Sequence, residues 1–377
     1  SVIRKTPRVG KNIHEVRNPF RARRRIAKTF ARLSNFVLNC AVPQSNISVP
    51  SRQPSSHDAC DLSVVIVSWN VAGLLRDCLD ALFSPEVSAG LRMEVIVVDN
   101  ASSDDSAQVA AAFESVRVVR NCRNIGYGSA NNIGFKLARG NYLLVLNPDT
   151  VALPGSLEAL VAFAERHTSA GIVAPRLLNP DGSIQRSAFR FPTLMMAFLD
   201  LFPLSRVVPG RLRNWISHST INGRYPGEPT KTQPYRIDHP LGAAMLLRRE
   251  AIENVGGFDE RLFMYSEEVD LAMRLRQVGW ERWQVPAARV IHLGGQSTKQ
   301  MPDRMLRELW RSRLYIYEKH HDPVSGIFLH TLIITAQVKE SIVTRLGAAL
   351  GTMPIKEANL RLRRARSLFR LALDMKR

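Results

Sequence analysis

The sequence predicts an α/β fold in which a mostly parallel sheet is flanked by helices, with a helical extension at the C-terminus. Short β-branched runs alternate with segments whose apolar residues recur at helical spacing, which is typical of parallel sheets with helices on both faces. The strand runs are apolar at nearly every position, as expected of strands buried on both faces. The chain of 377 residues is long enough for one large or two ordinary domains.

Four apolar runs predict the first strands, at residues 62–70, 93–99, 116–121 and 141–149. The first helix is expected at 72–83, because Leu74, Leu75 and Leu82 recur at helical spacing. Two more helices are expected, at 102–113 and 128–140. The second of these ends at Gly140, a residue suited to a helix C-terminus.

The second half of the chain repeats the pattern less regularly. A helix is expected after Leu157, and irregular structure in 190–236, where aromatic, Pro and basic residues are frequent. Other ordered segments are expected at 171–183, 241–260, 267–279, 281–295 and 303–321.

Positive charge is concentrated at the two ends of the chain. The formal net charge is +19. Residues 1–58 hold 12 Lys and Arg against 2 acidic residues, and residues 339–377 hold 10 against 3, so the middle is nearly neutral. We expect a basic arm and linker at 1–58, a globular domain at 59–322 and a basic amphipathic helical region at 323–377. Basic tails favour polyanions, either nucleic acid or an anionic membrane surface.

The sequence favours a cytoplasmic protein. No run approaches ~18 uninterrupted apolar residues, so no transmembrane helix is expected. The first residues lack the apolar core of a secretory signal. The four cysteines, at 40, 60, 78 and 122, fit neither a zinc site nor a disulfide framework, so free thiols are expected.

Two acidic residues stand where predicted strands end. Asp99 follows "VIVV" and Asp149 follows "LLVLNP". Asn, Pro and Asp are also ordinary turn residues, so each could simply mark a turn. Ligands bind at the carboxyl ends of strands in open α/β sheets, and two carboxylates at one edge indicate a site. The chain lacks both the glycine-rich turn of dinucleotide-binding folds and the P-loop lysine motif.

Six motifs in order resemble glycosyltransferase family 2, whose fold is called GT-A. They are "VVIVSWN", "VIVVDNASSDDS", "RNIGYGSANNIGF", "LLVLNPDT", "GGFDERLFMYSEEVDLAMRLRQVGW" and "ARVIHLGGQS". The resemblance covers about residues 62–320 and is strongest to bacterial rhamnosyltransferase-like members. It implies a GT-A domain at 59–322 and transfer of a hexose from a nucleoside diphosphate sugar.

The resemblance implies a divalent metal, Mg²⁺ or Mn²⁺, held by Asp149 and His292. A cation offsets the charge of the departing diphosphate, and hard cations prefer carboxylate oxygens. Asn147 stands where the family often has a first Asp, and it could instead bind the donor ribose or a metal-bound water. The implied donor-binding residues are Ser68, Asn70, Asp99, Asn124, Gly126, Asn131 and Asn147. For Asp99 a helix cap, and for Gly126 a plain turn, are the structural alternatives.

The acidic cluster after residue 266 is the candidate source of the base. An inverting transferase needs one group to accept the proton of the acceptor hydroxyl. By position in the family motif this is Glu268, with Glu267 as the fallback. Asp270 could orient the loop or cap the following helix. A solvated helix N-terminus is the alternative for the whole cluster.

The sequence therefore predicts an inverting glycosyltransferase that uses a dTDP- or UDP-sugar, with rhamnose as the candidate sugar. The acceptor would be a glycan or a lipid-linked glycan in cell-surface polysaccharide synthesis, reached from the cytoplasmic face of the membrane. Two alternatives remain open: a nucleotide-sugar-binding module without catalysis, and a nucleic-acid binder acting through the tails. The neutral middle argues against nucleic acid. The sequence leaves the oligomeric state undetermined.

Overall fold

The computed structural model describes residues 60–88, 90–203, 210–211, 219–223, 225, 228–296 and 298–374. The chain divides into two compact units, residues 1–50 and 51–377, and every described residue belongs to the second. The predicted basic arm at 1–58 lies outside the described residues, so its boundary stays a prediction.

Most described strands form one sheet, in the order β3-β2-β1-β4-β11-β6-β12-β5, with β7 beside β6 and β9 beside β12. The bounds are β1 Leu62–Ser68, β2 Met93–Asp99, β3 Val116–Arg120, β4 Tyr142–Leu146, β5 Thr150–Ala152, β6 Ala170–Leu178, β7 Ile184–Gln185, β9 Tyr235–Arg236, β11 Ala244–Arg248 and β12 Glu281–His292. A separate two-stranded sheet pairs β8 (Ala188–Phe189) with β10 (His239–Pro240).

The sheet is parallel where the sequence predicts it. β1 is parallel to β2 and β4, and β2 is parallel to β3. β11 is inserted antiparallel between β4 and β6, and β12 is parallel to β6. The predicted α/β class with a mostly parallel sheet is confirmed, and the carboxyl ends of β1, β2 and β4 meet at one edge.

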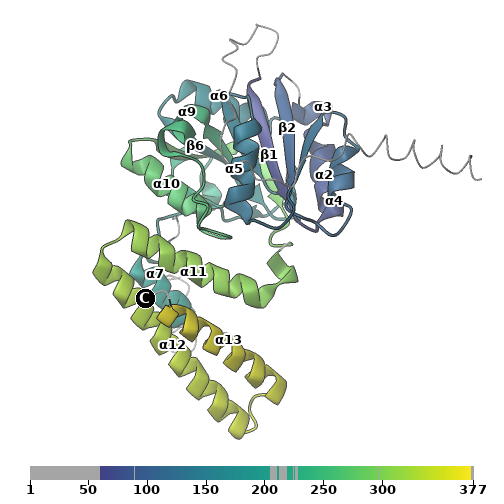
Figure 1. Cartoon of the computed structure of the whole chain (residues 1–377). Helices are drawn as coiled ribbons and strands as arrows, with labels where there is room; N and C mark the ends of the chain where they lie inside the picture. Colours follow the sequence, from purple (N-terminus) through teal and green to yellow (C-terminus); the bar gives the residue numbers. More distant parts are fainter. Residues whose placement is uncertain are drawn as a thin grey trace, which may run out of the picture. The chain divides into compact units, whose positions relative to one another are not determined.

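Helices cover both faces of this sheet, as Figure 1 shows for α5 and α10 on one face. The alternation of β1 divides the core: Val64 and Ile66 pack with α2, α4 and α6, whereas Val65 and Val67 pack with α5, α9 and α10. The helix bounds are α2 Ala72–Leu82, α3 Pro85–Ser88, α4 Ser106–Ala111, α5 Tyr127–Leu137, α6 Ser156–Arg166, α9 Arg249–Val255 and α10 Glu267–Gln277. The short 3-10 helices are η2 Thr220–Asn222, η3 Glu228–Thr230 and η4 Thr298–Gln300.

The C-terminal part is a helical bundle with a core of its own. Its helices are α7 Leu194–Leu201, α11 Pro302–His320, α12 Pro323–Ala349 and α13 Ile355–Asp374. Trp310, Leu314, Leu329 and Leu368 are buried together in this core, and Figure 1 shows the four helices side by side. The helical extension is confirmed, whereas the expectation of irregular structure throughout 190–236 is wrong for α7. The domain boundary at residues 322 and 323 stays a prediction.

α12 is the one helix of the described residues that is long and apolar enough to cross a membrane by length and composition. Its most apolar window is 33% buried, and a core helix of a soluble protein passes the same test. The expectation of no transmembrane helix therefore stays a prediction.

The thiols differ from one another. Cys60 and Cys78 are free, and Cys78 is buried in the core. Cys122 is disulfide-bonded, so the expectation of free thiols is wrong for this residue.

Candidate functional site

A cavity of about 260 Å³ lies at the edge of the sheet where β1 and β4 end. Six predicted site residues line it: Asn124, Asn147, Asp149, Glu267, Glu268 and His292. They come from four separate segments of the chain, so the fold brings them together. Trp69, Asn100, Tyr127, Gly242 and Tyr265 also line the cavity and were not identified from the sequence.

Asp149 and His292, the two predicted metal ligands, are neighbours. The antiparallel pairing of β5 with β12 places His292 opposite Thr150, and the backbone N–H of Leu293 donates to the carbonyl of Asp149 at 3.0 Å. Asp149 Oδ1 lies 3.5 Å from His292 Nε2, and both side chains are buried. Strand register therefore positions this pair.

Gln185 fixes the orientation of the His292 ring. The Nδ1 atom of His292 lies 2.7 Å from the side-chain oxygen of Gln185. The amide nitrogen of Gln185 donates to Asn179 Oδ1, which leaves its oxygen as the acceptor for an Nδ1–H. In this tautomer Nε2 carries the lone pair and faces Asp149, as a metal ligand requires.

The two glutamates at the start of α10 follow a strained turn. Tyr265 and Ser266 have φ of 71° and 68°, in the left-handed region. This conformation costs about 1–2 kcal/mol for each non-Gly residue, and strain of this kind clusters at functional sites. The turn directs Glu267 and Glu268 to the cavity that Asp149 lines.

Burial raises the pKa values of the Glu267 and Glu268 carboxyls to different extents. It raises the pKa of Glu268 to about 7. Burial, and then the charge of Glu268, raise the pKa of Glu267 well above its ordinary range. Near neutral pH Glu268 can therefore accept a proton, whereas burial favours the protonated form of Glu267.

Asn147 is held by Tyr127. The Tyr127 hydroxyl lies 2.9 Å from Asn147 Oδ1 and 2.9 Å from the carbonyl of Gly242. Burial, and then the charges of Glu267 and Glu268, raise the pKa of Tyr127, so the hydroxyl keeps its proton. The Asn147 amide lines the cavity in a fixed orientation.

Asn100 organises the loop before α5. Its Nδ2 donates to Asn124 Oδ1 at 3.0 Å, and its Oδ1 accepts from the backbone N–H of Ile125 at 3.1 Å. Gly126 has φ of 94°, and a Cβ there would lie 2.6 Å from the carbonyl oxygen of Phe263. The close approach that requires glycine is therefore to the protein backbone, and Gly126 is not among the residues that line the cavity.

Three predicted donor-binding residues, Ser68, Asp99 and Asn131, are buried and are not among the residues that line the cavity. Ser68 and Asp99 pair in register at the ends of β1 and β2. Ser68 Oγ, Asp99 Oδ1, Asn131 Oδ1 and Glu267 Oε1 are buried without a hydrogen-bond partner. Asp99 Oδ2 accepts from the backbone N–H of Ser102, but α4 begins at Ser106, so this bond closes the loop after β2 and is not the helix cap expected as the alternative. Buried polar atoms without partners are uncommon in folded proteins, and four of them here belong to predicted site residues.

Asn70 and Asp270 have structural partners. The side chain of Asn70 accepts from the backbone N–H of Ser103 at 2.7 Å. Asp270 is fully buried and lies 2.7 Å from Arg274 Nε, 2.6 Å from Lys319 Nζ and 2.7 Å from His320 Nε2. Neither residue is among those that line the cavity, and Asp270 links α10 to α11.

Residues 63–256, more than half of the chain, match the family described as Glycosyl transferase family 2. A curated relative is the N-acetylglucosaminyl-diphospho-decaprenol L-rhamnosyltransferase of Mycobacterium tuberculosis, 32% identical over 282 residues that cover 69% of this chain and 85% of the relative. The low-salt glycan biosynthesis hexosyltransferase Agl10 of Haloferax volcanii is 25% identical over 237 residues, which cover 62% of this chain and 67% of the relative.

A solved structure of the mannosyltransferase PcManGT from Pyrobaculum calidifontis is also similar, with 14% identity, a TM-score of 0.46, and coverage of 92% of this chain and 93% of that one. The family match and the rhamnosyltransferase relative agree with the six ordered motifs. The chain therefore belongs to glycosyl transferase family 2 and is a glycosyltransferase.

Proposed function

We propose that the protein is an inverting hexosyltransferase that moves a sugar from a nucleoside diphosphate donor to a hydroxyl of a lipid-linked glycan. One observation carries the proposal: Glu268, with a pKa of about 7, lines the same cavity as the Asp149–His292 pair. The proposed proton acceptor and the pair proposed to hold a cation for the diphosphate thus line one cavity.

Glu268 is the proposed base. The acceptor oxygen attacks the anomeric carbon and its proton passes to the Glu268 carboxylate. The bond between that carbon and the diphosphate oxygen breaks, and the diphosphate leaves with the electron pair. Glu267 suits this role less, because burial raises its pKa well above the ordinary range and so favours its protonated form. Asp270 is proposed to position α10 through its bonds to α11.

The residues present fit a divalent cation, Mg²⁺ or Mn²⁺. Asp149 offers a carboxylate oxygen and His292 offers Nε2, with its tautomer set by Gln185. No group of three or more His, Cys, Asp and Glu side chains able to hold a metal lies in the described part of the chain. That donor set suits a cation that keeps waters and substrate phosphate oxygens as its other ligands. Such a cation, when bound, offsets the charge of the departing diphosphate.

The nucleotide is proposed to lie against the first two strand ends. The unpartnered oxygens of Ser68 and Asp99 can accept and exchange hydrogen bonds with a base or ribose. Trp69 and Asn124, the neighbours of these strand ends, line the cavity, and Asn147 faces it with a fixed amide. Asn70, Gly126 and Asn131 are proposed to shape the loops around the donor.

Rhamnose, from a dTDP donor, is the proposed sugar, and a polyprenyl-diphosphate glycan is the proposed acceptor class. The support is the name of the mycobacterial relative, which acts on a lipid-linked N-acetylglucosamine. The proposed pathway is the synthesis of a cell-surface polysaccharide. UDP-sugars are the alternative donors.

The protein is proposed to act at the cytoplasmic face of the membrane. Val338, Ile342, Leu346 and Leu350 are exposed and recur every four residues, which forms an apolar stripe along α12. A groove beside this stripe is lined by Ile342 and by two basic residues, Arg345 of α12 and Arg366 of α13. Exposed apolar residues flanked by basic ones suit an anionic membrane surface.

The test is a transfer assay with the purified full chain. Candidate donors are dTDP-rhamnose, UDP-glucose and UDP-N-acetylglucosamine, each with Mg²⁺, Mn²⁺ or a chelator, and the acceptor is a short-chain polyprenyl diphosphate N-acetylglucosamine. Metal-dependent transfer with inversion at the anomeric carbon supports the proposal. Donor binding without transfer to any acceptor would instead favour a binding module.

A further inference from the structure

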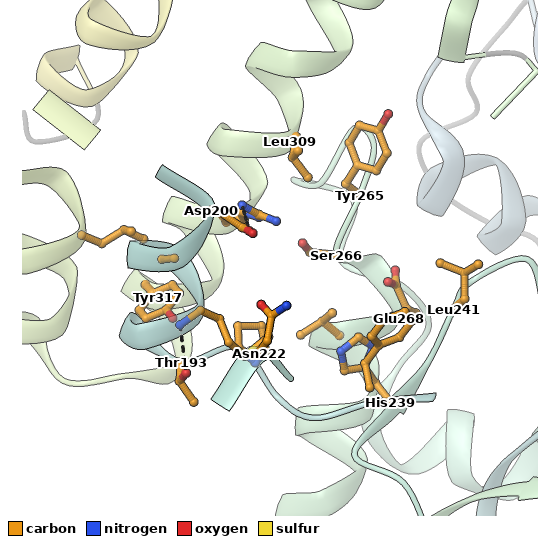
Figure 2. A pocket seen from close by; sticks show the side chains of 17 residues that line it. Thr193, Asp200, Asn222, His239, Leu241, Tyr265, Ser266, Glu268, Leu309 and Tyr317 are labelled. Atoms are coloured by element: carbon orange, nitrogen blue, oxygen red, sulfur yellow. Dashed lines mark hydrogen bonds and ion pairs between the residues drawn. The ribbon is translucent and has the colours of Figure 1, made fainter. Parts of the chain in front are cut away.

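A second cavity, of about 330 Å³, lies between the sheet domain and the C-terminal bundle. Its walls come from β8, β10 and the start of α10 on one side and from α7, α11 and α12 on the other. Figure 2 shows Glu268 and His239 on one side of this space, with Asp200 and Tyr317 on the other.

The two cavities share a wall. Leu241, Tyr265 and Glu268 line both of them. Tyr265 belongs to the strained turn before α10. Leu241 directly precedes Gly242, whose carbonyl accepts a hydrogen bond from the Tyr127 hydroxyl. The Glu268 side chain can therefore be reached from the donor side and from the bundle side.

Tyr317 lines the second cavity, and among the described residues its buried hydroxyl has no hydrogen-bond partner. The residue is 2% exposed. Its ring is fixed by stacking on His321, at 4.4 Å between centroids. Leaving such a hydroxyl unpaired costs free energy, and a bound ligand can remove this cost.

The other polar groups of this cavity suit a neutral ligand. Asp200 Oδ2 accepts from Arg313 Nη1 at 2.9 Å, so their charges offset each other. Burial lowers the pKa of His239 to about 4, which keeps its ring neutral. The remaining lining is largely apolar or aromatic, including Phe189.

The volume of the second cavity also limits the class of ligand that it can hold. Ligand cavities are typically about 300–1,000 Å³, so this one has room for a single ring rather than for an oligosaccharide. A diphosphate would need unpaired positive charge, and Arg313 is already paired. An uncharged pyranose offers hydroxyls to Tyr317, Asp200 and Arg313 and apolar C–H groups to the aromatic walls.

We infer that this second cavity is the acceptor site, and that it holds the uncharged sugar ring of the acceptor with its reactive hydroxyl toward Glu268. The inference rests on the proposed function and assigns the α7–α11–α12 helices to acceptor recognition. Asp200, Arg313 and Tyr317 determine which acceptor sugar is used, while the donor is held on the other side of Glu268.

The first experiment compares transfer kinetics of four variants with varied acceptor and varied donor. Tyr317→Phe removes only an unpartnered hydroxyl, and Asp200→Asn retains the shape of the side chain. Leu309→Trp fills the cavity from a half-buried position on α11. Each is expected to lower kcat/KM for the acceptor by about ten- to hundredfold and to leave the donor dissociation constant unchanged. Arg311→Gln, which loses only an ion pair to Glu308 on the same helix, is the control.

The second experiment measures binding without turnover. The Glu268→Gln variant is titrated, in the presence of the nucleoside diphosphate, with short-chain polyprenyl diphosphate N-acetylglucosamine or with the same lipid diphosphate lacking the sugar. Adding Leu309→Trp is expected to abolish the affinity gained from the sugar. If the sugar-bearing compound binds and Leu309→Trp blocks it, the inference holds even if the chain never transfers a sugar. If transfer is active but all three cavity variants match Arg311→Gln, the inference is overturned and the proposed function stands.

Discussion

Asp149 Oδ1 and His292 Nε2 lie 3.5 Å apart. The two residues are far apart in the sequence, because Asp149 follows β4 and His292 ends β12. The pairing of β5 with β12 brings them together, and Gln185 orients the imidazole. The pair is the proposed metal site, and its geometry leads to the first prediction.

Gln185→Leu removes the acceptor for His292 Nδ1–H and frees the ring to rotate. Loss of such a supporting bond is expected to weaken metal affinity by about 10–100-fold. Titration of Mn²⁺ by calorimetry, with the nucleoside diphosphate present, measures the change. Asp149→Ala should abolish metal binding with the melting temperature preserved. Unchanged Mn²⁺ affinity in both variants would remove this pair from the metal site.

Glu268→Gln keeps the shape of the side chain and removes its ability to accept a proton. Transfer is expected to fall by about 10²–10⁴-fold, with donor affinity retained. Glu267→Gln is the matched control and should be far less impaired, because burial already favours the protonated form of Glu267. The reverse order of the two variants in kcat would assign the base to Glu267.

The pH dependence of kcat/KM should report the Glu268 carboxyl of the free enzyme. Burial raises its pKa to about 7, and the base must be deprotonated to act. The rate is therefore expected to fall about tenfold for each pH unit below 7 and to level off above it. A rate that stays constant from pH 5 to pH 8 would contradict Glu268 as the base.

The same pKa shift has a consequence for stability. The folded-state pKa of Glu268 is raised above its unfolded value, so the folded state favours the protonated carboxyl. The stabilisation from this protonated carboxyl is fully present below the unfolded pKa and is lost as the pH rises through about 7. Glu268→Gln is therefore expected to melt at a higher temperature than the wild type at pH 8, with a much smaller difference at pH 5. Thermal unfolding of both proteins at the two pH values gives the comparison.

Asp270→Asn should destabilise the fold. Burial favours the protonated form of this carboxyl, but hydrogen bonds from His320 and Lys319 and the charge of Arg274 hold its pKa below the ordinary value. Breaking such a buried network costs about 3–5 kcal/mol, because the basic partners lose their counter-charge. Denaturant unfolding measures the loss. Glu357→Gln, at an exposed pair with Arg361, is the control and should change stability by less than about 1 kcal/mol.

The apolar stripe of α12 is expected to bind anionic vesicles. Replacing Ile342 and Leu346 with Asp should reduce co-sedimentation of the full chain with anionic vesicles, because both side chains are exposed and hydrophobic. The control is the double variant Gln108→Asp and Ala112→Asp, which adds the same charge at two exposed positions, one in α4 and one directly after it. Equal loss in both double variants, or equal binding to neutral vesicles, would rule out this surface.

The sequence by itself determined the α/β class and the order of the strands along the chain, and it predicted the site residues as a hypothesis. Strand-end position, a local signal, indicated Asp99 and Asp149, whereas His292 and Glu268 were predicted from the resemblance to glycosyltransferase family 2. Asn100 and Tyr127 lie within the quoted motifs, so a local signal existed for them as well.

Only the tertiary structure decided which of these residues share a cavity. The antiparallel register of β5 on β12 sets the Asp149–His292 distance, and no local pattern encodes a pairing between distant segments. Gln185 contributes through a short strand that pairs with β6, and the sequence carries no local signal for it. The second cavity arises because α7, α11 and α12 bury an apolar core against one another beside the start of α10. Long-range packing, rather than propensity, places Tyr317 and Glu268 around the same space.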